Sequence, residues 1–100
     1  MATFVRYSQT AATSLTAVNG SGPTNASIVI GLIASNTGTA SDTVDVTIGS
    51  DTNFILKNAP IPTGSTLSIL DGKLVLNAND IVKAKSTNGN VILTLSVLEL

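Results

Sequence analysis

The sequence predicts an all-β fold: a single antiparallel β-sandwich of about eight or nine short strands spanning residues 1–100. Three observations favour it. Thr, Val and Ile, whose β-branched side chains suit a pleated strand, occur throughout. Gly, Pro and Asn interrupt these segments repeatedly, and no window shows the apolar spacing of a helix. A jelly-roll-like arrangement fits this pattern, and a closed barrel is the structural alternative.

Strands are expected where apolar or alternating segments lie between turn-forming residues. Alternation is clearest at 43–48, where Val44, Val46 and Ile48 share one face. Residues 26–35 are almost continuously apolar, which is typical of a central strand covered on both faces. The expected strands are residues 2–8, 14–18, 26–35, 43–48, 54–56, 66–70, 73–76, 81–85 and 91–100.

Several turns are indicated by specific residues. Asp71-Gly72 predicts a hairpin joining 66–70 to 73–76, because Gly supplies the positive φ of a tight turn. Asn88-Gly89 predicts a second hairpin. Pro60 and Pro62 cannot donate to a strand ladder, so residues 57–62 are expected at an edge or in a crossing connection.

The two ends of the chain have the pattern of strands. In 91–100, Val91, Leu93, Leu95, Val97 and Glu99 form the expected core face, while Phe4 and Arg6 lie on the opposite face of 2–8 from Val5 and Tyr7. Isolated monomers commonly fray at their termini. Apolar residues this close to both ends therefore suggest an N-terminal strand added to, or exchanged with, a neighbouring subunit.

Composition excludes several classes of function. The chain has no Cys and no His, so thiolate zinc sites and the commonest general base are absent. Five basic and six acidic residues give a net charge of −1, which predicts no nucleic-acid binding. No apolar run reaches the roughly 20 residues of a membrane helix, and no secretory signal is evident. Only 11% of residues are charged, which suggests that a partner covers part of the surface.

Candidate chemistry is sparse, and we expect no enzyme, no catalytic residue, no cofactor and no metal. Ser65 and Ser68 lie near Asp71 and Lys73, a spacing that a Ser-rich β protein produces by chance. Asp42, Asp45 and Asp51 are candidates for a carboxylate pair, but the plainer interpretation is that they are solvent-facing strand and turn residues. Oxygen ligands for calcium are offered by Ser41-Asp42, Asp51 and Asn53, and by the turn 77–80, but no calcium-loop motif is present. In that last turn, side-chain hydrogen bonds are expected to close the chain.

The second half carries a resemblance. Lys57-Asn58-Ala59-Pro60 and Gly64-Ser65 precede Leu70-Asp71-Gly72-Lys73-Leu74-Val75-Leu76, then Asp80-Ile81-Val82-Lys83-Ala84, and the chain closes with Ser96-Val97-Leu98-Glu99-Leu100. In this order and spacing, residues 28–100 resemble a group of short virion proteins of tailed bacteriophages, especially marine phages and cyanophages. The resemblance implies a structural virion protein, and it carries over no catalytic residue.

We therefore expect a capsid decoration (cement) protein that stabilises the assembled particle within the virion. A neck or tail accessory or attachment protein is the first alternative. The second, a carbohydrate-binding module, is disfavoured by the absence of Trp. The expected partners are the major capsid protein or neck and tail proteins, together with further copies of the chain in a homo-oligomer such as a trimer. Neither nucleic acid nor a membrane is expected as a partner.

Overall fold

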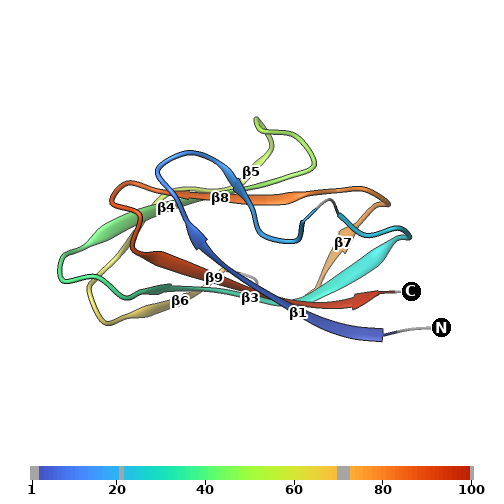
Figure 1. Cartoon of the computed structure of the whole chain (residues 1–100), viewed down its shortest axis with the longest axis horizontal. Coiled ribbons are helices and arrows are strands. Elements are labelled where there is room, and N and C mark those ends of the chain that lie inside the picture. Colours follow the sequence, from blue (N-terminus) through green and yellow to red (C-terminus); the bar gives the residue numbers. More distant parts are fainter. Residues whose placement is uncertain (1–2, 21, 70–72, 100) are drawn as a thin grey trace.

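The computed structural model describes residues 3–20, 22–69 and 73–99, and everything it describes is strand, turn or loop. Nine strands form two sheets packed into a sandwich, with overall extents of 42 × 23 × 19 Å (Figure 1). No helix that could cross a membrane is found within these ranges. The strands are β1 (Thr3–Ala11), β2 (Thr16–Ala17), β3 (Ser27–Asn36), β4 (Asp42–Ile48), β5 (Phe54–Ile61), β6 (Thr66–Ser68), β7 (Leu74–Leu76), β8 (Val82–Ser86) and β9 (Val91–Glu99).

The order of the strands is that of a jelly roll. One sheet, here called sheet A, has the order β1-β9-β3-β6, with β7 also paired to β3, and the other, sheet B, has the order β2-β8-β4-β5. Every pair is antiparallel, and the first strand pairs with the last along its whole length. Strands far apart in the sequence are thus neighbours, as in the nested pairing of a double-sheet jelly roll. The predicted sandwich is confirmed.

The core lies between the two sheets and is aliphatic. Sheet A contributes Leu93 and Leu95 from β9, and sheet B contributes Val44 and Val46 from β4, all fully buried. The alternation in the sequence predicted these faces correctly, because side chains along a strand point alternately to opposite faces. The buried apolar set is completed by Ala11, Val18, Val29, Leu32, Ala34, Ile48, Ile61, Leu76, Val82, Ala84, Val91 and Val97.

The hairpin predicted between 66–70 and 73–76 is wrong. Ser68 of β6 pairs with Ile33, whereas Leu74 of β7 pairs with Val29, and both strands run antiparallel to β3. They therefore run in the same direction, one after the other, along a single edge of sheet A. The predicted turn at Asp71-Gly72 itself lies outside the described residues. Two strands on either side of a turn signal need not pair with each other when a longer third strand pairs with both of them.

The second predicted hairpin, at Asn88-Gly89, is also wrong in its pairing. The chain does turn here, with φ of +73° at Gly89, but β8 belongs to sheet B and β9 to sheet A. Figure 1 shows the chain leaving the upper layer at the end of β8 and entering the lower layer as β9. The turn is therefore an arch that connects the two layers.

The prediction that 57–62 lies at an edge is confirmed. Residues 57–61 continue β5, which pairs with β4 alone among the described strands and so forms an edge of sheet B. Pro60 is tolerated within it because a missing N–H is harmless on a side without a neighbouring strand. The expected short strand at 54–56 is thus the beginning of a longer one.

β3 is central, as predicted, but it is covered on one face only. Val29, Leu32 and Ala34 are buried in the core, whereas Ile30 and Ile33 remain 42% and 38% exposed. A register shift between Val29 and Gly31 inserts one extra residue here, which makes a β-bulge at Ile30. The prediction of a strand covered on both faces is therefore wrong for the single chain, which leaves the outward face of β3 open.

Candidate interaction surface

A row of apolar side chains crosses the outward face of sheet A. Phe4 on β1 lies directly opposite Leu98 on β9, Leu98 lies opposite Ile28 on β3, and Ile28 lies opposite Val75 on β7. Directly opposed residues on neighbouring strands have Cβ atoms about 5 Å apart, so these four side chains form a contiguous strip, here called the apolar row. Phe4 is 73% exposed and Val75 63% exposed.

The apolar row borders an open hollow. The next residues along the strands are Arg6, Ser96 and Gly31, which are again directly opposed across β1, β9 and β3. Ser96 has a small side chain and Gly31 has none, so the surface is lower here. Phe4, Arg6 and Ile30 line the resulting hollow, which has a volume of about 240 Å³. The space suits an apolar side chain of a partner, with a guanidinium beside it for a carboxylate.

The outward face of sheet B has a different chemistry. Asp45 of β4, only 4% exposed, accepts a hydrogen bond from the backbone N–H of Asn58 at 2.6 Å. The ammonium groups of Lys57 and Lys85 each lie 3.9 Å from its other oxygen, and Lys57 also lies over the ring of Phe54 at 4.2 Å. These charged groups have partners within the chain, so they offer a binding protein no unpaired charge.

A second hollow, of about 470 Å³, opens at the edge of the sandwich between β5 and β7. Ile48, Ile55 and Leu74 line it together with polar groups such as Asn53 and Asp80. No aromatic ring is among its lining residues, whereas sugar binding commonly uses aromatic platforms. This hollow gives no support to the carbohydrate-binding alternative.

Asp42 and Asp51, two of the candidate calcium ligands, lie at opposite ends of β4 and are not brought together. Asp42 begins β4, and its carboxylate accepts hydrogen bonds from the backbone N–H groups of Thr43, Asn88 and Asn90 at 2.8, 3.0 and 3.3 Å. Asp51 lies beyond the other end of β4 and pairs with Lys83 at 2.9 Å. Within the described residues, no group of three or more acidic residues could hold a metal ion.

The expectation that these carboxylates face solvent holds for Asp51 and is wrong for Asp42 and Asp45, which are 3% and 4% exposed. Both are buried because backbone N–H groups of distant segments bind them. The turn 77–80 behaves as predicted: the backbone N–H of Asn77 donates to Asp80 Oδ2 at 2.9 Å. Ser68 and Lys73 are exposed, and Asp71, their neighbour in the sequence, lies outside the described ranges.

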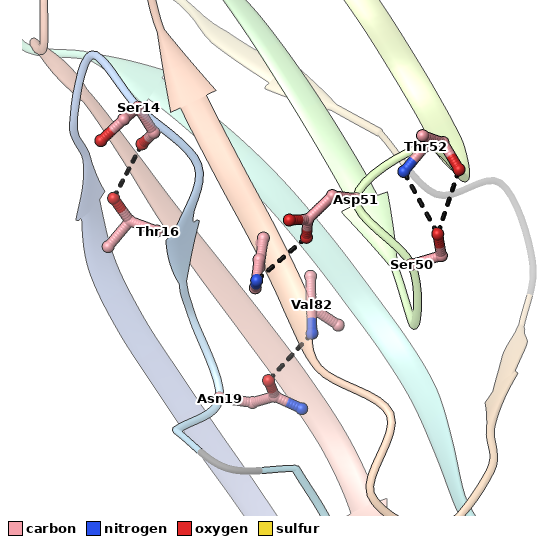
Figure 2. A network of polar contacts seen from close by, with 8 residues as sticks. Ser14, Thr16, Asn19, Ser50, Asp51, Thr52 and Val82 are labelled. Carbon is pink, nitrogen blue, oxygen red and sulfur yellow. Dashed lines mark hydrogen bonds and ion pairs between the residues drawn. The ribbon is translucent and has the colours of Figure 1, made fainter.

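Two buried asparagine side chains that hydrogen-bond to the backbone of the loops were not predicted from the sequence. The side chain of Asn36, 3% exposed, donates to the carbonyl groups of Ala40 and Ile61, both at 2.9 Å, and accepts from the backbone N–H of Gly38 at 2.9 Å. Asn19 acts similarly between β2 and β8 (Figure 2). The bonds of Asn36 to Gly38 and Ala40 are local, but its burial also depends on Ile61, 25 positions away, and that of Asn19 on Val82, 63 positions away, which the sequence does not indicate.

No protein-family model matches this chain, and no curated protein sequence matches it. The resemblance to virion proteins of tailed phages therefore remains a prediction that rests on the residues named for it.

Proposed function

We propose that this chain is a structural protein of a tailed-bacteriophage virion, and that it decorates the capsid, binding and stabilising the assembled particle. The observation that supports this most directly is the apolar row beside its hollow on sheet A. The central strand β3 has large aliphatic side chains on both faces, Val29 and Leu32 toward the core and Ile30 and Ile33 outward, which is typical of a strand covered on both sides. The uncovered face therefore fits a protein that works while bound to another protein.

The chemistry of the described surface agrees with a binding role. Exposed Phe4 and Val75 lie at opposite ends of the apolar row, so the apolar area is one strip and not a scatter of isolated residues. Contiguous exposed apolar patches on soluble proteins commonly mark protein–protein contacts. The partner we propose is the major capsid protein, which would contribute apolar side chains to the hollow and an acidic group to Arg6.

Decoration also explains why one small contact suffices. A single contact of this size binds weakly, but a capsid presents many equivalent sites. Copies that are themselves linked in a homo-oligomer bind several sites at once, which raises the overall affinity without new kinds of contact. Neck or tail proteins are the alternative partners, since the same surface fits a ring around the neck or an attachment module.

The first test is to locate the chain in purified particles of the phage that encodes it. We expect peptides of the chain in the particle fraction and antibody-gold labelling spread over the capsid. Labelling confined to the neck or tail would replace decoration by the alternative. Absence of the chain from washed particles would contradict the proposal as a whole.

The second test assigns the binding surface. Phe4→Lys and Val75→Lys each place a charge in the apolar row, so we expect either variant to lose binding to particles that lack the protein. The melting temperature should stay within a few degrees, because both side chains are exposed. Thr39→Lys is the matched control: Thr39 is exposed in the loop after Asn36, at the end of β3 far from Phe4. Equal binding by all three variants would exclude this face.

A further inference from the structure

The two sheets have edge strands that differ in their protection against pairing. At the far edge of sheet A, β6 and β7 are only three residues long each. In sheet B, β2 has two residues, and β5 combines Pro60 with a positive φ at Asn58 and two register shifts against β4. Short strands, proline and bulges are the devices that prevent an edge from pairing with another chain.

The remaining edge, β1, has none of these devices. It is nine residues long and pairs with β9 without a register shift. It contains no Pro, Gly or Lys, and Arg6 is its one charged residue. Its far end is occupied, since the carbonyl of Ala11 accepts from Ser86 Oγ at 2.8 Å. From Thr3 to Thr10, however, no strand of the described chain lies on its outer side.

We propose that β1 pairs with β1 of a second copy of this chain, antiparallel and about a two-fold axis at Tyr7. An antiparallel strand is complementary to itself, because each copy presents the donors and acceptors that the other lacks. Because each chain has a net charge of only −1, electrostatic repulsion between two copies is weak. Sheet A then continues through the dimer as one sheet.

The register follows from the length of the edge and from its charge. Centring on Tyr7 pairs residues 4–10 of the two copies, which is all of the open stretch except Thr3, with Arg6 opposite Ser8 and Phe4 opposite Thr10. Centring on Arg6 places two guanidinium groups opposite each other, which is unfavourable. Centring on Val5 or on Ser8 leaves more of the open edge unpaired than centring on Tyr7 does.

This dimer matters for the surface of sheet A. Directly opposed residues across a ladder share a face of the sheet, so the two-fold axis is perpendicular to the sheet. Both apolar rows then face the same way, which suits a partner with repeated sites. The inference stands apart from the proposed function: a chain that stays monomeric yet labels capsids would overturn the dimer and leave decoration standing.

The first experiment measures self-association by analytical ultracentrifugation at protein concentrations from roughly 1 to 100 µM, a range that resolves dissociation constants in the micromolar range. We expect a species of twice the 10.1 kDa chain mass. Ser8→Lys, which faces Arg6 of the other copy, should weaken the dimer about tenfold, whereas Ser8→Glu should not weaken it. Combining Arg6→Glu with Ser8→Lys should restore it. A monomer throughout, a trimer, or equal effects of Lys and Glu at position 8 would overturn the proposal.

The second experiment reads the register directly. The chain has no cysteine, so single thiols can be placed cleanly. Arg6→Cys mixed with Ser8→Cys should form a mixed disulfide faster than either variant forms one with itself, since directly opposed Cβ atoms lie at bonding distance. Thr94→Cys, outward-facing on β9, is the control and should not react with Arg6→Cys. Preferential Arg6→Cys self-linkage, or equal rates for all pairs, would overturn the Tyr7-centred register.

Discussion

The hydroxyl of Tyr7 donates a hydrogen bond to Glu99 Oε2 at 2.7 Å, joining residues that are 92 positions apart in the sequence. Tyr7 lies on β1 and Glu99 at the end of β9, so the contact reinforces the pairing of the first and last strands. The place of β1 in sheet A depends on this pairing, because β9 is its one neighbour among the strands that the structure describes.

Tyr7→Phe should lower the free energy of unfolding by about 1 kcal/mol near neutral pH, because it removes one half-exposed hydrogen bond to a charged group and leaves the ring in place. Chemical denaturation followed by circular dichroism measures this change. Thr10→Val on the same strand, exposed and without such a bond, is the control and should change it by less than about 0.5 kcal/mol.

The same contact makes the free energy of unfolding depend on pH in the alkaline range. The hydrogen bond to Glu99 raises the pKa of Tyr7 above its usual value, with smaller contributions from burial and from the negative charge of Glu99. The folded state therefore keeps the phenolic proton more tightly than the unfolded state does. The contribution of this hydrogen bond to the free energy of unfolding is present in full below the pKa of Tyr7 in the unfolded state, about 10. It is lost as pH rises through the higher pKa of Tyr7 in the folded state.

This is the only tyrosine and the chain has no Trp, so absorbance of the phenolate reports its titration directly. We expect Glu99→Gln to shift the titration midpoint of the folded protein downward, toward the usual value for tyrosine. An unchanged midpoint would show that Glu99 does not hold the proton.

Gly22→Ala should be strongly destabilising. A Cβ at Gly22 would lie 2.7 Å from the backbone carbon of Asn79, and the φ of +90° is one that side chains rarely adopt. Backbone on both sides must then move, which we expect to cost about 3 kcal/mol. Gly20→Ala is the control, since its φ is also positive at +66° but nothing lies within 4 Å of the added atom. It should cost only about 1 kcal/mol. Equal melting temperatures for the two variants would contradict the close approach.

Local pattern predicted the strands well, because alternation depends only on neighbouring residues. Val91, Leu93 and Leu95 were assigned to the core from period-two spacing alone, and all three are fully buried. The pairing of strands was not predictable in this way. Val82 and Ala84 of β8 face the core from sheet B, while Val91 faces it from sheet A. The same alternation is consistent with a hairpin or with an arch, and the turn residues Asn88 and Gly89 suit both.

The candidate surface was only half predictable. Alternation predicted that Phe4 and Arg6 share one face of their strand, opposite Val5 and Tyr7, and the structure confirms it, but alternation alone did not say which face points outward. What the sequence does not contain is the alignment of Phe4, Leu98, Ile28 and Val75, because it depends on registers among four strands. The burial of Asp45 was missed for a related reason: the N–H that binds it belongs to Asn58 in the irregular part of β5.

Asp45→Ala should destabilise the protein by about 2 kcal/mol. It removes the acceptor of the Asn58 N–H and leaves Lys57 and Lys85 facing each other without a counter-charge. Asp51→Ala provides the matched comparison, because its bond to Lys83 lies on the surface, with the Asp51 side chain 62% exposed. Exposed ion pairs contribute about 0.5 kcal/mol or less. If urea denaturation gives the two variants equal losses, the burial of Asp45 has no energetic consequence.

Asn19→Ala should cost about 2–3 kcal/mol, because the side chain satisfies groups on β8 and in the turn before it. Its Oδ1 accepts from the backbone N–H of Val82 at 2.9 Å, and its Nδ2 donates to the carbonyl of Asp80 at 3.2 Å. Figure 2 shows the first of these bonds together with the exposed bond from Thr16 Oγ1 to the carbonyl of Ser14. Thr16→Val loses only that exposed bond and keeps a β-branched side chain, so it should cost about 0.5 kcal/mol or less. For a chain of this size the difference corresponds to a melting temperature at least about 6 °C lower for Asn19→Ala than for Thr16→Val. A smaller gap would mean that water replaces Asn19 as the partner of Val82, and that the buried amide does not hold β2 against β8.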